Sequence, residues 1–182
     1  MDNRDENRVI PKVTNKFSYL SPEEMKSISL WILRIENLQA IIEMQERTVH
    51  LERAIKTLRL KYKKIGNGGQ RIVFDLNNGY VLKVALNGRG VESNKREWQL
   101  FFSSPPHIRK HLCPVERCGH GWIIMKNMTS QLMSVKAYDK KKIERLIKKF
   151  KKNGITPQDT KIDNLALTKN GTIIVLDYGN FI

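Results

Sequence analysis

Apolar side chains recur at steps of three and four residues between positions 25 and 58, which is the period of an amphipathic helix. Ser21 precedes this stretch as a candidate N-cap, with Pro22 at the first helical position and Glu24 at the capping-box position. The pattern does not distinguish one bent helix from two helices joined near His50. The apolar positions are Met25, Ile28, Trp31, Ile32, Ile35, Leu38, Ile42, Met44, Val49, Leu51, Ile55 and Leu58.

From Lys64 onward the pattern changes to short β-rich segments separated by glycine and asparagine. An Asn-Gly step at 78–79 lies between two apolar segments, and this arrangement is the strongest short-range signal for a β-hairpin. The spacing predicts a helix over about 92–102, ended by the Ser-Ser-Pro-Pro run that follows it. Strands are expected from about 64, at 71–76, 80–86, 115–118 and 122–125.

The C-terminal part predicts one more helix and one more hairpin. The helix covers about 140–152, where lysines surround a single apolar face and Gly154 follows as a stop signal. The hairpin covers 164–179 and turns at Asn170-Gly171. The polar residues 1–18 show no periodicity and predict a flexible arm.

The chain is strongly basic, with 33 Lys and Arg against 18 Asp and Glu and a net charge of +15. Residues 1–60 hold ten basic and nine acidic side chains (+1), and residues 61–182 hold the other 23 and nine (+14). A field of this sign attracts nucleotides, nucleic acid or an acidic protein. Nucleic acid is therefore a candidate partner, although a solvated basic surface is the simpler interpretation, also for the lysine-rich helix.

No run of about 18 apolar residues and no secretory signal is present, so we expect no membrane contact and a cytoplasmic location. Cys113 and Cys118 are too few for a disulfide framework, and reduced thiols are expected. His107, His111 and His120 lie close to these cysteines in sequence. Their spacing fits no zinc-finger pattern, so we do not expect zinc there.

A glycine-rich turn is expected at residues 66–69, between two strands. Glycines in such a turn let backbone N–H groups approach phosphate oxygens without a side chain in the way. Gly66, Gly68 and Val73 resemble the protein-kinase pattern G-x-G-x-x-G-x-V, and Gly69 adds to the turn. Arg71 stands where the third glycine of that pattern would be, and from there it can lie along the cleft.

Lys83 is a single charged residue in the apolar segment VLKVA, and it resembles the kinase lysine that neutralises phosphate charge. An ammonium group in such a strand needs a partner, because an unpaired buried charge is costly. Glu97 on the next predicted helix is the favoured partner. Glu92 is its rival, with helix capping as its alternative role.

Two motifs near the C-terminus resemble the kinase catalytic loop and metal motif. Asp159 and Asn164 have the D-x-x-x-x-N spacing of a loop in which Asp handles the hydroxyl proton and Asn binds metal. Lys161 stands where serine/threonine kinases place a lysine that contacts the transferred phosphate. Asp177 opens a D-Y-G tripeptide after an apolar strand and resembles the D-F-G metal motif. Asp163 is interpreted as a turn residue without assigned chemistry.

Taken in order, these motifs make residues 60–182 similar to the protein-kinase-like superfamily, and most similar to its compact bacterial and phage members. The resemblance implies an α+β fold with an antiparallel five-stranded N-lobe, one helix in that lobe, and a much reduced helical C-lobe. The expected divisions are a flexible arm (1–18), an N-terminal helical extension (19–60), the N-lobe (61–128) and the reduced C-lobe (129–182).

The same resemblance implies an ATP- and Mg²⁺-dependent phosphotransferase that moves the γ-phosphoryl group to a hydroxyl acceptor, such as a protein Ser or Thr. Lys83, held by Glu97, and the turn at Gly66, Gly68 and Gly69 would then bind phosphates. The metal ligands would be Asn164 and Asp177, the catalytic residues Asp159 and Lys161, and the adenine-binding backbone that of Lys126 to Met128.

The sequence ends three residues after Gly179, so we expect the platform for a protein substrate to be missing and the acceptor to stay undefined. Residues 19–60 are candidates to replace that platform, to form an oligomer or to inhibit. One alternative is a pseudokinase that binds nucleotide or a partner without turnover. A second is a basic nucleic-acid-binding or inhibitor protein. If the chain is phage-encoded, the host cytoplasm is its expected location.

Overall fold

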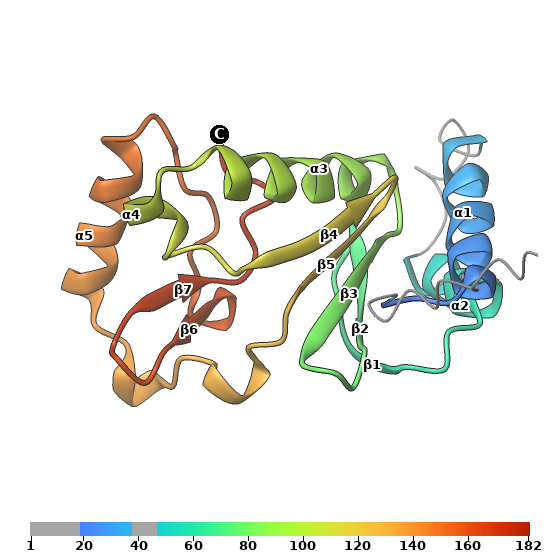
Figure 1. Cartoon of the computed structure of the whole chain (residues 1–182), viewed down its shortest axis with the longest axis horizontal. Helices are drawn as coiled ribbons and strands as arrows, with labels where there is room; N and C mark the ends of the chain where they lie inside the picture. The colour runs from blue at the N-terminus through green and yellow to red at the C-terminus, as the bar shows by residue number, and fades with distance from the viewer. Residues whose placement is uncertain (1–18, 38–46) are drawn as a thin grey trace, which may run out of the picture.

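The computed structural model of the chain describes residues 19–37 and 47–182 (Figure 1). The predicted arm at 1–18 and the apolar positions Leu38, Ile42 and Met44 lie outside the described residues. The strands are β1 (Lys63–Asn67), β2 (Arg71–Asp75), β3 (Tyr80–Ala85), β4 (Val115–Gly119), β5 (Trp122–Lys126), β6 (Leu165–Leu167) and β7 (Ile173–Val175). The helices are α1 (Pro22–Asn37), α2 (Arg47–Leu58), α3 (Gly88–Ser103), α4 (Pro106–Arg109) and α5 (Lys140–Lys151), with short 3-10 turns η2 (Thr129–Gln131), η3 (Val135–Ala137) and η4 (Ile162–Asn164).

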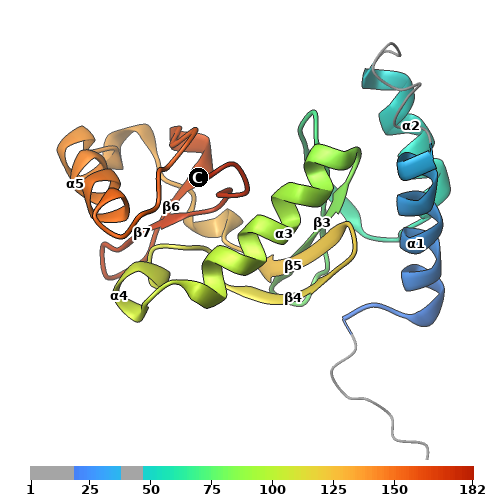
Figure 2. The same ribbon diagram turned by 90° about the horizontal axis from the view of Figure 1, so that it is seen from above.

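The helix α1 begins where the capping pattern predicts. The Ser21 backbone N–H donates to Glu24 Oε2 at 2.7 Å, and the Glu24 N–H donates to Ser21 Oγ at 3.2 Å. This reciprocal pair satisfies two amide groups that a helix start leaves without intrahelical partners. The helices α1 and α2 pack against each other at the end of the molecule opposite α5 (Figures 1 and 2). The apolar period therefore belongs to two helices.

Strands β1 to β5 form the predicted five-stranded antiparallel sheet, and its strand order, which the sequence did not predict, is β1-β2-β3-β5-β4. Within it, Lys83 on β3 lies opposite Val73 on β2 and Ile123 on β5. The hairpin between β2 and β3 turns through Asn77 and Gly79, whose φ angles of 57° and 86° lie in the left-handed region. The Asn-Gly signal thus identifies this turn correctly.

One face of the sheet is closed by the N-terminal helices. Ile72, Leu82 and Ile124 on the strands share a core with Trp31 and Ile35 on α1. The Trp31 Nε1–H donates to the carbonyl of Ala85 at 2.8 Å, which fixes the helix to the end of β3. Burial of these apolar side chains is the main stabilising contribution of the extension.

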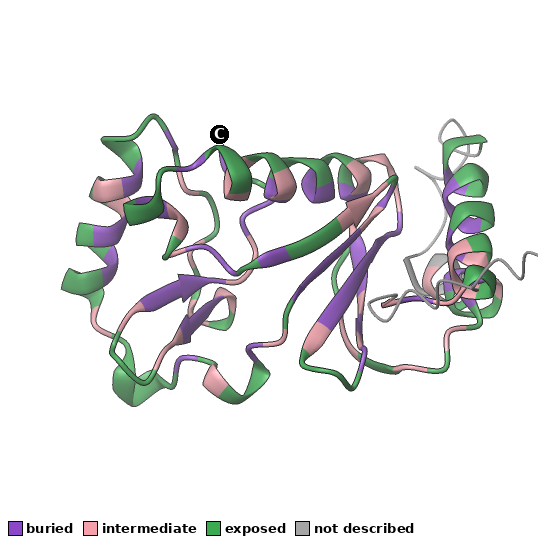
Figure 3. Cartoon of the chain, viewed as in Figure 1, coloured by how far each residue is buried: buried purple, intermediate pink, exposed green. Residues whose placement is uncertain are grey.

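The opposite face of the sheet packs on the C-terminal part of the chain. Val81, Ile123 and Met125 join a second core with Leu112 and Phe150, and Figure 3 shows the buried strand segments in purple. Neighbouring side chains of a strand point to opposite faces. Because Leu82 belongs to the first core, Lys83 projects from the face that meets the C-terminal part, and this places the functional site.

The helix α3 begins at Gly88, four residues before the predicted start at Glu92. Asn87 is its N-cap, and its side-chain oxygen accepts from the Gly90 N–H at 3.0 Å. A Cβ at Gly90 would lie 2.1 Å from the Gln70 carbonyl oxygen, so only glycine fits where this turn packs against the hairpin. The two glycines hide the start of the helix from a periodicity argument. Glu92 consequently lies inside the helix and does not cap it.

The C-terminal part contains α5, which Asp139 caps through its side chain at the Lys142 N–H, and the antiparallel hairpin of β6 and β7. Ile143, Leu146 and Phe150 of α5 are buried. Both elements agree with the prediction, whereas the single turn α4 was not predicted. In the described parts of the chain, no helix combines the length and apolar character that crossing a membrane requires.

Candidate functional site

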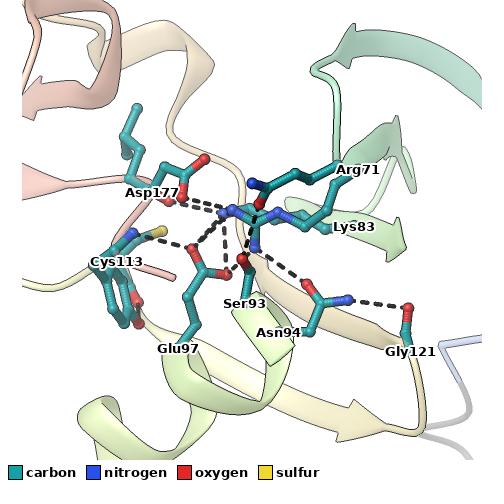
Figure 4. Close-up of polar contacts among 11 residues, drawn as sticks. Arg71, Lys83, Ser93, Asn94, Glu97, Cys113, Gly121 and Asp177 are labelled. Carbon is teal, nitrogen blue, oxygen red and sulfur yellow. Dashed lines mark hydrogen bonds and ion pairs between the residues drawn. The ribbon is translucent and has the colours of Figure 1, made fainter. Parts of the chain in front are cut away.

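Four charged residues from four separate elements meet between the sheet and the C-terminal part (Figure 4). Arg71 opens β2, Lys83 lies on β3, Glu97 lies on α3, and Asp177 follows β7 by two residues. We call this set the charge cluster. It joins the sheet, its helix and the C-terminal hairpin at one point.

The pair of Lys83 and Glu97 that the sequence favoured is present. Lys83 Nζ lies 3.0 Å from Glu97 Oε1 and 3.3 Å from Oε2, and it also donates to the Leu176 carbonyl at 2.9 Å. Glu97 is 0% exposed, whereas Glu92 is exposed on the same helix. The rival pairing with Glu92 is therefore wrong.

Arg71 also binds Glu97, which the sequence argument did not anticipate. Its Nη1 lies 2.7 Å from Glu97 Oε2 and 3.1 Å from Asn94 Oδ1, and its Nη2 lies 2.5 Å from Asp177 Oδ1. The sequence signal for this contact was Arg71 itself, which stands where the kinase pattern has its third glycine. A guanidinium at the mouth of a glycine-rich turn reaches both carboxylates of the site.

The charges of the cluster balance, two cations against two carboxylates. Glu97 accepts hydrogen bonds from Arg71, Lys83 and the backbone N–H of Tyr178, the last at 3.1 Å. A buried carboxylate is tolerated only with such compensation, because desolvation of an unpaired charge costs several kcal/mol. The cluster thus fixes the position of Glu97 between the sheet and the C-terminal part.

The electrostatics keep Asp177 ionised. Burial alone would raise the pKa of Asp177, but Lys83 and Arg71 lower it from 3.8 to about 2. Its side chain is 42% exposed, in contrast to Glu97. Asp177 is therefore the carboxylate of the cluster that a ligand can reach from solvent.

The D-x-x-x-x-N loop forms a second, exposed cluster. Lys161 Nζ lies 2.9 Å from Asp159 Oδ1, and Asn164 Nδ2 donates to the Asp159 carbonyl at 2.9 Å. Asp159 has a φ of 54°, a left-handed conformation that Asp and Asn adopt more readily than most residues. The predicted catalytic residues Asp159 and Lys161 are thus brought together by local contacts.

The hairpin of β6 and β7 connects this loop to the charge cluster. The Leu176 N–H donates to the Asn164 carbonyl at 2.8 Å, so Asn164 lies across from the residue that precedes Asp177. Carboxylate and amide oxygens are donors that Mg²⁺ prefers. The donor types at Asp177 and Asn164 therefore fit this ion, although Arg71 binds one Asp177 oxygen. Among the residues that the structure describes, no group of three or more His, Cys, Asp or Glu could hold a metal.

The glycine-rich turn is held by contacts within the chain. The Gly68 N–H donates to the Arg71 carbonyl at 2.9 Å, and the Gly69 carbonyl accepts from Asn87 Nδ2 at 2.9 Å. Gly66 pairs with Val73 in the β1–β2 ladder. In this arrangement the Gly68 N–H is used inside the hairpin, so a phosphate would compete with that bond.

The segment expected to bind adenine is largely engaged as well. The Lys126 N–H donates to the Pro114 carbonyl at 2.9 Å, and the Met128 carbonyl accepts from the Gln131 N–H at 2.8 Å. The Lys126 carbonyl accepts from the Cys113 thiol, with a sulfur to oxygen distance of 3.4 Å. A thiol is a weak donor, so this carbonyl is the group most easily turned to a ligand.

The histidines and cysteines of the 107–120 segment take up separate structural positions. His111 Nδ1 lies 2.9 Å from the Ile173 carbonyl, and His120 Nε2 lies 2.5 Å from Glu36 Oε1 on α1. Burial raises the pKa of the Cys113 thiol to about 12. His111 and His120 thus connect elements at different points of the fold.

A cavity of about 620 Å³ lies beside the charge cluster, because Gln70, which precedes Arg71, and Gly179, two residues after Asp177, line it. Its wall includes Glu36 on α1, Arg89, Glu92 and Arg96 on α3, and His120. None of the four residues of the charge cluster lines it, and its own charges are of mixed sign. We therefore place the candidate site at the charge cluster, where four elements position the groups.

Comparison with protein-family models and with curated proteins found no match. Among solved structures, the chain is similar to structures of the bifunctional kinase-methyltransferase WbdD, one of them a complex with a kinase inhibitor. The identity is 18%, the TM-scores are 0.46 to 0.47, and the overlap covers 63 to 66% of this chain. The chain spans about a third of WbdD, 30 to 33%. At this identity and overlap, neither residues nor activity transfer from WbdD to this chain.

Proposed function

We propose that this chain has a kinase-like fold and is a phosphotransferase that uses ATP and Mg²⁺. The observation that carries the proposal is the buried Lys83–Glu97 pair, which meets Asp177 beside the Asn164 loop. Such a site supplies a fixed cation for phosphates next to oxygen donors for a metal. The five-stranded sheet and the reduced C-terminal part agree with that arrangement.

In this proposal each group has one task. Lys83, oriented by Glu97, neutralises phosphate charge, and Asp177 with Asn164 would hold Mg²⁺. The ion would supply charge neutralisation on the phosphate oxygens. The carbonyl of Lys126 and the backbone around Met128 are the candidate adenine contacts. The turn at 66–69 would cover the phosphates after release of the Gly68 N–H.

The transfer step uses the exposed loop. The acceptor hydroxyl oxygen forms a bond to the γ-phosphorus while the bond from that phosphorus to the β,γ-bridging oxygen breaks, and ADP leaves. The hydroxyl proton passes to Asp159, whose carboxylate Lys161 orients. Both side chains lie at the surface, with exposures of 43% and 72%, so a large acceptor can reach them. A protein Ser or Thr is one acceptor class that this exposure admits.

The proposal is tested with radiolabelled ATP and a panel of acceptors that includes the chain itself, generic proteins and small alcohols. We expect Mg²⁺-dependent label transfer that Asp177→Asn abolishes, with Asp75→Asn as a control at an acidic residue on β2. A chain that neither transfers phosphate nor shows an ATP-dependent shift in melting temperature would contradict the proposal.

One observation favours a second candidate, a pseudokinase that binds nucleotide without turnover. Arg71 occupies Asp177 Oδ1, one of the two carboxylate oxygens that a metal could use. A permanent contact of this kind would weaken Mg²⁺ binding at Asp177. Nucleotide binding without label transfer in the same panel would identify this function.

A further inference from the structure

Arg71 has no task in the proposed reaction, yet it is the residue that joins the two carboxylates of the charge cluster. It is 7% exposed, and its guanidinium reaches Glu97 through Nη1 and Asp177 through Nη2. Asn94 holds the same guanidinium at 3.1 Å and is itself fixed by a bond from its amide to the Gly121 carbonyl at 3.0 Å. The guanidinium is therefore held in one orientation from the side of α3.

The two carboxylate contacts of Arg71 differ in accessibility. Glu97 is 0% exposed and also accepts from Lys83 and the Tyr178 N–H, so no solvent-borne anion can replace it. The Asp177 side chain is 42% exposed. A ligand that enters from solvent can take the place of Asp177 at Nη2 while the contact to Glu97 stays intact.

A phosphate group suits the position that Asp177 vacates. Guanidinium binds carboxylate and phosphate oxygens with the same planar fork of N–H donors. Lys83 shares the Glu97 carboxylate with Arg71, so a phosphate at this point meets two cations that one buried anion holds together. The glycine that the kinase pattern has at this position would supply neither the positive charge nor the N–H donors of a guanidinium.

We propose that Arg71 is a second cationic ligand for the phosphates of the nucleotide, and that Asp177 occupies its outer N–H groups when no nucleotide is bound. The inference rests on the proposed function, because it concerns the same nucleotide site. Phosphate binding at this site then needs no divalent cation. Release of Asp177 from Arg71 would leave both of its carboxylate oxygens available to Mg²⁺.

The test measures the affinity of the full chain for ATP by isothermal titration calorimetry, once with excess EDTA and once with Mg²⁺. In EDTA we expect measurable binding by the wild type and a loss of about 10- to 100-fold in Arg71→Gln, the range of a charged hydrogen bond. Asp177→Asn should bind ATP more tightly than the wild type in EDTA, by up to about tenfold, because the competing carboxylate is gone.

Arg89→Gln is the matched control, since Arg89 is an exposed arginine on α3 and is not a member of the charge cluster. It removes one positive charge and should change the affinity by less than about twofold, as expected for a screened surface charge. Urea unfolding of each variant at the assay temperature shows that it is folded. If Arg71→Gln does not fold, the ATP affinity of Asp177→Asn in EDTA tests the inference instead. This variant keeps Arg71 and alters only a half-exposed side chain.

Tighter binding by Asp177→Asn in EDTA supports the inference, and unchanged or weaker binding overturns it. Wild-type binding that requires Mg²⁺, or an Arg71→Gln affinity equal to that of the wild type, also overturns the role of Arg71 but leaves the proposed function standing. No ATP binding by the wild type in either buffer would overturn both.

Discussion

The charge cluster and the Asp159 loop are built in opposite ways. The cluster gathers residues separated by up to 106 positions in sequence, and its central Glu97 is fully buried. In the loop, the contacts of Asp159 with Lys161 and Asn164 span at most five residues, and the Asp159 and Lys161 side chains are exposed. Buried long-range contacts couple a site to the stability of the whole fold, whereas exposed local contacts do not.

The two clusters therefore have different roles: the charge cluster stabilises the fold, and the Asp159 loop presents groups to an acceptor. The cluster holds the sheet, α3 and the C-terminal hairpin in register, so a change there affects folding before it affects chemistry. The loop presents groups to an acceptor and can lose them at little cost to the fold. The following substitutions test that division, in order of their expected effect on stability.

The largest effect is expected for Glu97→Ala. It removes the anion that neutralises Arg71 and Lys83 inside the protein, and breaking a buried pair from one side costs about 3–5 kcal/mol. Urea unfolding followed by circular dichroism measures the loss.

Glu92→Ala is the matched control, because Glu92 is exposed on the same helix. It should stay within about 0.5 kcal/mol of the wild type. Equal losses for the two variants would show that the cluster contributes nothing particular to stability.

A smaller effect is expected for Gly179→Ala, in the segment that follows the cluster. The added Cβ would lie 2.7 Å from Ser93 Cβ and 2.9 Å from the Ser93 carbonyl oxygen on α3. Overpacking of this kind costs about 1–3 kcal/mol. Gly68→Ala is the control, since its Cβ would meet nothing within 4 Å. Equal unfolding midpoints for the two variants would show that the segment at Gly179 can shift away from Ser93 without loss of stability.

A third effect depends on pH. Because the pKa of Asp177 is lowered from 3.8 to about 2, its ionised form stabilises the folded chain above pH 4, and that contribution is lost as the pH falls toward 2. Solvent screening at this half-exposed side chain limits it to about 1 kcal/mol. We therefore expect the wild type to lose more stability between pH 4 and pH 2 than Asp177→Asn does, as measured by urea midpoints. Parallel losses would show that Asp177 has an ordinary pKa.

The hairpin of β2 and β3 and the Lys83–Glu97 pair could be predicted because both rest on neighbouring segments of the sequence. Asn78-Gly79 indicates the hairpin, and a lysine inside an apolar strand needs a partner, which the kinase resemblance places at Glu97 on the next helix. The contact of Arg71 with Asp177 could not, because it spans 106 residues and depends on how the hairpin and the C-terminal part pack. The start of α3 was missed for a related reason, since the tight approach of Gly90 to Gln70 is a tertiary contact.

The smallest effect on stability is expected at Asp159. Substitution there gives the clearest contrast between the Asp159 loop and the charge cluster. Asn tolerates the left-handed φ of 54°, and the bond from Asn164 to the backbone carbonyl of residue 159 persists in Asp159→Asn. The pair with Lys161 is exposed and screened by solvent, so the free energy of unfolding should stay close to that of the wild type.

Phosphate transfer, in contrast, should fall by about 10²- to 10⁴-fold in Asp159→Asn, because the proton acceptor is removed. Asp163→Asn, at an exposed position of η4 in the same loop, is the control and should leave both quantities unchanged. The affinity for ATP, which depends on the charge cluster, should also stay the same. A large loss of stability in Asp159→Asn would contradict this assignment of roles, because the exposed loop would then stabilise the fold as the buried charge cluster does.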